Sequence, residues 1–161
     1  MSTLNELDSS SKVWIYQASR ELKTEEVQEL STAAEAFCKG WTAHNAQLKA
    51  GFEIRYNRFI IFAVDESHNT ASGCSIDKSV HFLTEAGKRL QVGFFDKLQM
   101  FYHKGDSIAE LPMAAVQQAW QSGEINQDTI FINTLAGNIE EYRKKFEIPF
   151  SLHWLSSRVK V

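Results

Sequence analysis

Six consecutive apolar residues, from Phe59 to Val64, constrain the fold of this chain more than any other segment. A strand with apolar side chains on both faces has to be covered on both faces. We therefore expect residues 59–64 to form an interior strand of a sheet. Residues 52–56 instead alternate between apolar and charged side chains, which predicts an edge strand that turns at Asn57-Arg58 into the interior strand.

The other periodic segments complete a familiar order of elements. Strands are predicted at 13–17 and 97–103, and apolar steps of three and four predict helices over 24–40 and 76–90. The resulting order β-α-β-β-α-β is that of the split βαβ or ferredoxin-like arrangement. Two right-handed crossovers give the spatial strand order 4-1-3-2, which places the apolar strand inside and the charged strand at an edge. The sequence therefore predicts an α+β fold with a ferredoxin-like core.

The last third of the chain is expected to cover the second face of that sheet. The sequence of this part predicts a helix over 112–122, a strand over 129–133 and a helix that begins near Asn138 and ends at Pro149. A ferredoxin-like sheet carries helices on one face, whereas its interior strand is apolar on both. We therefore expect residues 1–161 to form a single domain, with 1–11 as a loose tail, 12–105 as the core and 106–161 as a C-terminal extension.

Composition and charge exclude several classes of function. The 161 residues include 43% hydrophobic residues, enough for a core, and 17 basic against 20 acidic residues, a net charge of about −3 without long charged runs. This balance is not that of a nucleic-acid-binding protein, because phosphate backbones require a basic surface. No apolar run reaches the roughly 20 residues of a membrane span, and the polar N-terminus does not resemble a signal peptide. We expect a cytosolic protein.

Cys74 is the most suggestive candidate for chemistry. The segment Gly73-Cys74-Ser75 places a cysteine at the start of a predicted helix, where unpaired N–H groups and the helix dipole lower the pKa of a thiol. A nucleophilic or redox-sensing thiol would use His81 or His68 as base and Asp77 as orienting group. The alternative is a small residue packed under the start of a helix.

A second set of residues suggests a ligand site. Arg55, Asn57 and Arg58 could bind an anion on the edge hairpin, although charge at an edge strand also prevents unwanted strand pairing. Trp41 and His44, which follow the first helix, could line a pocket, although a tryptophan at a helix end often covers the core.

The sequence suggests neither a metal nor a cofactor. The two cysteines and five histidines lack the spacing of a zinc site, and two cysteines are too few for a disulfide framework. A phosphate-binding loop needs Gly-x-x-x-x-Gly-Lys-Ser/Thr. The chain's Gly87-Lys88 is followed by Arg89, and residue 82 is Phe, which excludes nucleotide hydrolysis by that machinery.

Across nearly all of its length the chain resembles a family of bacterial proteins without established activity, whose members are often labelled as ABC-transporter ATPases. The segments that carry the resemblance are 13–17, 49–59, 72–77, 80–82, 94–96, 123–125, 128–129, 149–150 and 153–154. The resemblance implies no catalytic role for any residue, and the missing phosphate loop separates this chain from the activity in the label.

Two functions follow as hypotheses. The first is a binding or interaction module for a small molecule or a protein, without ATPase activity. Ferredoxin-like sheets often associate through their edges or faces, so a homodimer formed at a sheet edge is possible for this fold, and the partner is otherwise open. The second is a thiol-dependent enzyme or redox sensor that uses Cys74.

Overall fold

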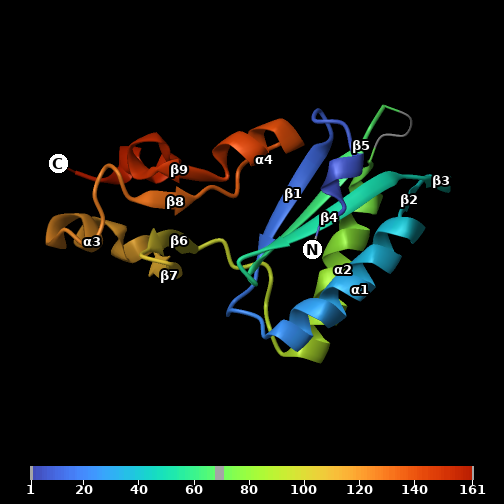
Figure 1. Ribbon diagram of the computed structural model, residues 1–161, viewed down its shortest axis with the longest axis horizontal. Helices are drawn as coiled ribbons and strands as arrows, with labels where there is room; N and C mark the ends of the chain where they lie inside the picture. Colours follow the sequence, from blue (N-terminus) through green and yellow to red (C-terminus); the bar gives the residue numbers. More distant parts are fainter. Residues whose placement is uncertain (1, 68–70, 161) are drawn as a thin grey trace. The chain divides into compact units, whose positions relative to one another are not determined.

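The computed structural model describes residues 2–67 and 71–160, without the side chain of Cys74. It is an α+β structure that divides into two compact units (Figure 1). The first unit contains the residues up to Phe95 together with Ala136–Tyr142, and the second contains Asp96–Leu135 and the residues from Arg143 onward. These bounds differ from the segments 12–105 and 106–161 that we expected, and the single domain over 1–161 stays a prediction.

The elements of the first unit are η1 (Leu4–Glu6), β1 (Lys12–Gln17), α1 (Thr24–Gly40), β2 (Thr42–Ala43), β3 (Ala46–Gln47), β4 (Lys49–Arg55), β5 (Phe59–Asp65) and α2 (Gly73–Leu90). Within the described residues, β1, β5 and β4 form a three-stranded antiparallel sheet in that order. This matches the 1-3-2 part of the predicted order, and the interior position of the apolar strand is confirmed.

Helices α1 and α2 lie side by side over one face of this sheet (Figure 1). Alternate residues of β5, namely Ile60, Phe62 and Val64, point into the core that these helices cover. An aromatic cluster fills its centre, where the rings of Trp41 and Phe37 lie 5.8 and 5.6 Å from that of Phe62. This face is a conventional helix-on-sheet core.

The opposite face of the sheet is covered as well. All seven residues of β5 are buried, so its second set of side chains, including Phe59 and Ile61, also lies in a core. Tyr142 reaches this face, where its hydroxyl donates a short hydrogen bond to the carboxylate of Glu53. Residues 136–142 of the C-terminal third belong to the first unit, and the cover of this face by the whole of residues 106–161 stays a prediction.

The N-terminal residues do not form the loose tail that we expected. Leu4 and Leu7 are buried, and the backbone N–H of Thr3 donates to the carbonyl of Phe52 at 2.8 Å. An isolated bridge also pairs Ser2 with Glu53, so this segment extends the β4 edge. The tail prediction overlooked two leucines in an otherwise polar stretch, and burying them holds the segment on the sheet.

The ferredoxin-like sheet is not completed by the predicted fourth strand. Residues 99–104 form β6 (Gln99–Lys104), which pairs with β7 (Ser107–Pro112) and β8 (Ile130–Ile132) in the second unit and not with β1. The start of β1 is instead bridged at its outer edge, where the backbone N–H of Val13 donates to the carbonyl of Gly137. Pairing β6 with β7 closes only the two-residue turn at Gly105-Asp106 and therefore loses little chain entropy. Pairing β6 with β1 would close a loop of about 80 residues and lose more.

The second unit has its own core. Its sheet has the strand order β7-β6-β8-β9, with β9 at Glu147–Pro149, and it also contains η2 (Met113–Ala115), α3 (Val116–Ser122), η3 (Phe150–Leu152) and η4 (Trp154–Arg158). Helix α4 (Ile139–Lys145) begins in the first unit and ends in the second. The core of the second unit includes Tyr102, Phe131 and Phe150. No helix in the described part of the chain has both the length and the apolarity to cross a membrane.

Candidate functional site

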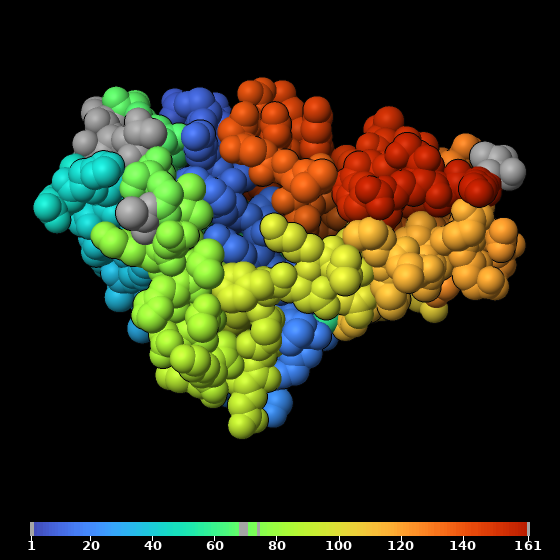
Figure 2. Space-filling view, turned by 180° about the vertical axis from the view of Figure 1, so that it is seen from behind, coloured from blue at the N-terminus to red at the C-terminus, as the bar shows by residue number. Residues whose placement is uncertain are grey.

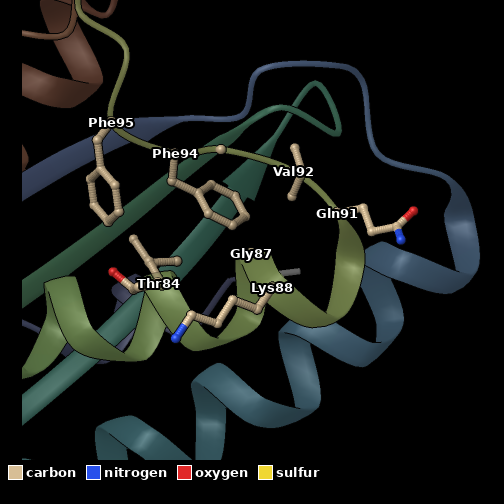
Figure 3. A pocket seen from close by; sticks show the side chains of 9 residues that line it. Thr84, Gly87, Lys88, Gln91, Val92, Phe94 and Phe95 are labelled. Carbon is tan, nitrogen blue, oxygen red and sulfur yellow. The ribbon is translucent and has the colours of Figure 1, made fainter.

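A depression of about 440 Å³ opens between the C-terminal half of α2 and the segment 91–95 that follows it (Figure 3). Its floor is buried and apolar and is made by Leu83, Val92 and Phe94. Phe94 and Phe95 point from the segment toward the helix, and Thr84 and Lys88 come from the helix itself. Figure 2 shows α2, in green, at the surface of the molecule.

The shape of this depression depends on Gly87. Helix α2 ends at Gln91, which adopts a left-handed conformation with φ of 55°, and the chain then turns back along the helix. The N–H of Val92 donates to the carbonyl of Gly87 at 3.0 Å. A methyl group on Gly87 would overlap the carbonyl oxygen of Val92, so only glycine allows this close return.

Part of the backbone around the depression is already hydrogen-bonded. Gly93 donates its N–H to the hydroxyl of Ser19 at 3.0 Å, and its carbonyl accepts the N–H of Ser19 at 2.8 Å. The polar groups that face outward are therefore side chains: the Thr84 hydroxyl, the Lys88 ammonium and the Gln91 amide. This combination of an apolar floor and a few polar side chains is typical of small-molecule sites.

Phe95 is the lining residue whose exposure is least explained by packing within the fold. Its side chain is 42% exposed although it is a large apolar group. Its ring meets the ring of Tyr16 edge-on, with centroids 5.8 Å apart and planes at 89°, and the Tyr16 hydroxyl is within 3.1 Å of the Ser79 hydroxyl. Phe95 is thus held in place on one side and open on the other.

Asp77 and His81, two of the residues predicted to act with Cys74, are on the same helix. Asp77 and His81 are exposed, and together with Thr84 and Lys88 they follow at steps of four, three and four, so they share one face of α2. No hydrogen bond joins Asp77 to His81 among the described side chains. Cys74 lies in the first turn of α2, but its side chain and all of His68 are outside the described residues.

The start of α2 is capped by two serine side chains. The hydroxyl of Ser72 accepts the N–H of Ser75 at 3.2 Å, and the hydroxyl of Ser75 accepts the N–H of Ser72 at 2.6 Å. This reciprocal pair is a capping box, which satisfies donors at the helix start.

Cys38 is a core residue. It is buried among the residues between α1 and the sheet. Burial, and to a lesser extent Glu35, raise the pKa of its thiol to about 12. Because the thiolate is the reactive form, this shift disfavours reaction of Cys38 in the folded protein.

The predicted ligand residues do not form a common site. Trp41 and His44 lie before the start of β4, whereas Arg55, Asn57 and Arg58 lie at its end, which is about 20 Å away at the rise of a strand. His44 and Asn57 are exposed turn residues with positive φ. The turn itself is formed by Tyr56-Asn57 and not by Asn57-Arg58.

Two of these residues have structural roles instead. The Arg58 guanidinium is buried and donates to the carbonyls of Ala18 and Ser19 at 3.1 and 3.0 Å. Trp41 is 1% exposed, and its indole N–H donates to the carbonyl of Ser75 at 2.8 Å. A binding role is therefore not supported for either, because their polar groups are already used within the fold.

Arg55 belongs to a separate cluster on the second sheet face. Its guanidinium lies 5.2 Å from the ring centre of Tyr56 and 6.0 Å from that of Tyr142. Burial first, and then the hydrogen bond to Glu53, raise the pKa of the Tyr142 hydroxyl. The groups of this cluster stabilise one another, so we assign it to the packing of residues 136–142 on the sheet.

Sequence reasoning missed Thr84, Lys88, Gln91 and Phe95. Phe94 and Phe95 are neighbours in the sequence, but Phe94 is buried whereas Phe95 is 42% exposed. The available signal was Gly87, a glycine in the apolar stripe of a helix, which indicates that another backbone comes close.

Comparison with known proteins does not assign the chain to a family. No protein-family model matches the chain, and neither a curated protein nor a solved structure is significantly similar to it. Among the described residues, no three His, Cys, Asp or Glu side chains are grouped so that they could hold a metal ion.

Proposed function

We propose that this protein is a cytosolic binding module that takes a small, largely apolar molecule into the depression between α2 and residues 91–95. The observation that carries the proposal is the exposed ring of Phe95 at the rim of a cavity with an apolar floor. Its volume of about 440 Å³ falls in the range of about 300–1,000 Å³ that is usual for small-molecule sites.

The proposed activity is binding without ATP hydrolysis. Gly87-Lys88, the chain's only Gly-Lys pair, lies inside α2 and close to its end. A phosphate loop would require these residues in a glycine-rich turn before a helix, where backbone N–H groups surround the phosphates. The resemblance to proteins labelled as ABC-transporter ATPases therefore supplies no role for these residues.

The test uses a neutral aromatic probe, 2-naphthalenemethanol, added to the isotopically labelled full chain. We expect saturable shifts of backbone amide resonances within residues 83–95, because the ring would pack against Phe95 and the floor. Phe95→Ser should weaken binding at least fivefold, whereas Leu152→Ser, which changes a side chain that is 73% exposed, should leave binding unchanged. Shifts centred on other residues, or equal binding by both variants, would refute the proposal.

A thiol-dependent activity of Cys74 is the second candidate, and the position of this residue in the first turn of an 18-residue helix favours it. Alkylation by iodoacetamide at different pH values tests it cleanly because Cys38 is silent. With a thiol pKa of about 12, Cys38 is about one part in 10⁴ thiolate at pH 8.

We expect the Cys74→Ser variant to react only after unfolding, whereas the Cys38→Ser variant reports Cys74 alone. A reaction midpoint well below pH 8.5, slowed by His81→Ala, would support the thiol mechanism. A midpoint at about 8.5 without an effect of His81→Ala would eliminate it.

A further inference from the structure

We propose that the ligand of the depression is a planar aromatic anion, with its ring against Phe95 and its acidic group beside Lys88. This inference rests on the proposed function and specifies the chemical class of the ligand. It follows from the exposed ring, the charged residues of α2 and the hydrogen bonds that the depression leaves unused.

The ring of Phe95 selects a flat apolar partner. Its edge-on contact with Tyr16 fixes its orientation, and 42% of its surface stays open. Aromatic rings pair in offset-stacked or edge-to-face geometry with an aromatic partner, which a flat ligand supplies and a branched aliphatic one does not. Leu83 and Phe94 lie behind this surface but are 0% and 1% exposed, so the open apolar contact for the ligand comes mainly from Phe95.

Lys88 supplies the positive charge. Its ammonium lies 3.1 Å from the Glu85 carboxylate, in a pair whose side chains are 69% and 46% exposed. Such exposed pairs contribute little, so an incoming carboxylate or sulfonate can replace Glu85 at small cost. Lys88 belongs to the lining of the depression, together with Thr84 one turn earlier on the helix.

Glu85 is the carboxylate that a ligand anion would have to displace. Lys88 lowers the pKa of the Glu85 carboxyl most strongly, with further contributions from His81 and Arg89. Arg89 is paired with Glu29 at 3.4 Å and does not line the depression, so Lys88, itself paired with Glu85, is the cation among the lining residues. A ligand anion would compete with the Glu85 carboxylate for the Lys88 ammonium.

The remaining polar groups fit a ligand with few hydrogen bonds. The Thr84 hydroxyl donates to the carbonyl of Val80 at 2.8 Å and can still accept one bond. The N–H groups of Val92 and Gly93 and the carbonyl of Gly93 are already engaged. A sugar or a peptide would bring many polar groups into a site that satisfies few of them, whereas an aromatic acid brings one.

The experiment compares three probes of nearly equal shape: 2-naphthoate, 2-naphthalenemethanol and 2-naphthylmethylammonium. Dissociation constants come from amide shifts within residues 83–95 at pH 7.5 and low salt. We expect the anion to bind about three- to fivefold more tightly than the neutral probe, and the cation to bind most weakly. In Lys88→Glu the order should reverse, so that the cation binds best.

Lys39→Glu is the matched control. Lys39 is an exposed lysine on α1 paired with Glu35 at 3.3 Å, as Lys88 is paired with Glu85, but it does not line the depression. It should leave the order of the probes unchanged. Comparing probes within one variant cancels any change in its stability.

The outcomes separate the two proposals. The proposal of an aromatic anion is wrong if all three probes bind equally well within residues 83–95, or if Lys88→Glu acts no differently from Lys39→Glu. Either result would leave the proposed binding function unaffected. If none of the probes shifts these amides at millimolar concentration, the proposed function fails together with this inference.

Discussion

Replacing Phe62 by alanine is expected to lower the free energy of unfolding by about 3–5 kcal/mol. Phe62 is fully buried, and its ring contacts those of Tyr16, Phe37, Trp41 and Phe82 in the core under α1 and α2. Alanine would leave a cavity that these large rings cannot close by small movements. Urea unfolding, followed by far-ultraviolet circular dichroism, measures the loss.

The same experiment on Ile61 tests whether β5 is covered on its second face. Ile61 points away from the helices and is nevertheless 0% exposed, so Ile61→Ala should also cost about 2–4 kcal/mol. Leu152→Ala is the control, because a side chain that is 73% exposed should change stability by less than about 0.5 kcal/mol. An Ile61→Ala variant as stable as the control would contradict the two-sided burial of β5.

Gly87→Ala is expected to destabilise the protein by about 1–3 kcal/mol. The added methyl group would overlap the Val92 carbonyl, so the helix end and the segment 91–95 would have to move apart. Because Val92 and Phe94 make the floor of the depression, the same change should weaken binding of the naphthalene probes. Denaturant unfolding and probe titration give both effects.

Gly40→Ala provides the matched comparison. Gly40 is also a helical glycine, but an added methyl group would meet nothing within 4 Å. The better helix propensity of alanine should make this variant as stable as the wild type, or more stable by up to about 1 kcal/mol. Equal effects of the two substitutions would show that the return of the chain past Gly87 is not tight.

The core of the first unit could be predicted because its signals are local. The continuous apolar run required burial on both faces of β5, and the charged alternation of residues 52–56 placed β4 at an edge, as the structure shows. Helical periodicity located α1 and α2 to within a few residues. These features depend on which side chains share a face of a strand or helix, and the spacing of residues in the sequence determines that directly.

The pairing of the fourth strand could not be predicted in the same way. The side-chain pattern of residues 99–104 fits a strand paired with β1 as well as a strand paired with β7. Which pairing forms depends on the competition between a local hairpin with β7 and a distant pairing with β1. The hairpin had a signal that we did not use: Gly105, with φ of 61°, followed by Asp106 is a two-residue hairpin turn. Residues 107–112 lack strong alternation, so they were not recognised as β7.

The candidate site was the least predictable part. Cys74 and the arginines of the hairpin attract attention by their chemistry, but Arg58 and Trp41 turned out to bind backbone carbonyls within the fold. The depression depends instead on a glycine, the end of a helix and the direction of one phenylalanine. None of these carries a chemical signature in the sequence, because a depression is a property of tertiary packing.

The location of a bound probe shows whether the depression between α2 and residues 91–95 is the ligand site. Isotope-filtered NOE spectra of the protein with 2-naphthoate measure which protein protons lie within about 5 Å of the ligand ring. We expect contacts with the side chains of Phe95, Val92 and Thr84, which line the depression. Contacts confined to Tyr56 on the β4–β5 hairpin, or to Leu152 in the second unit, would contradict it.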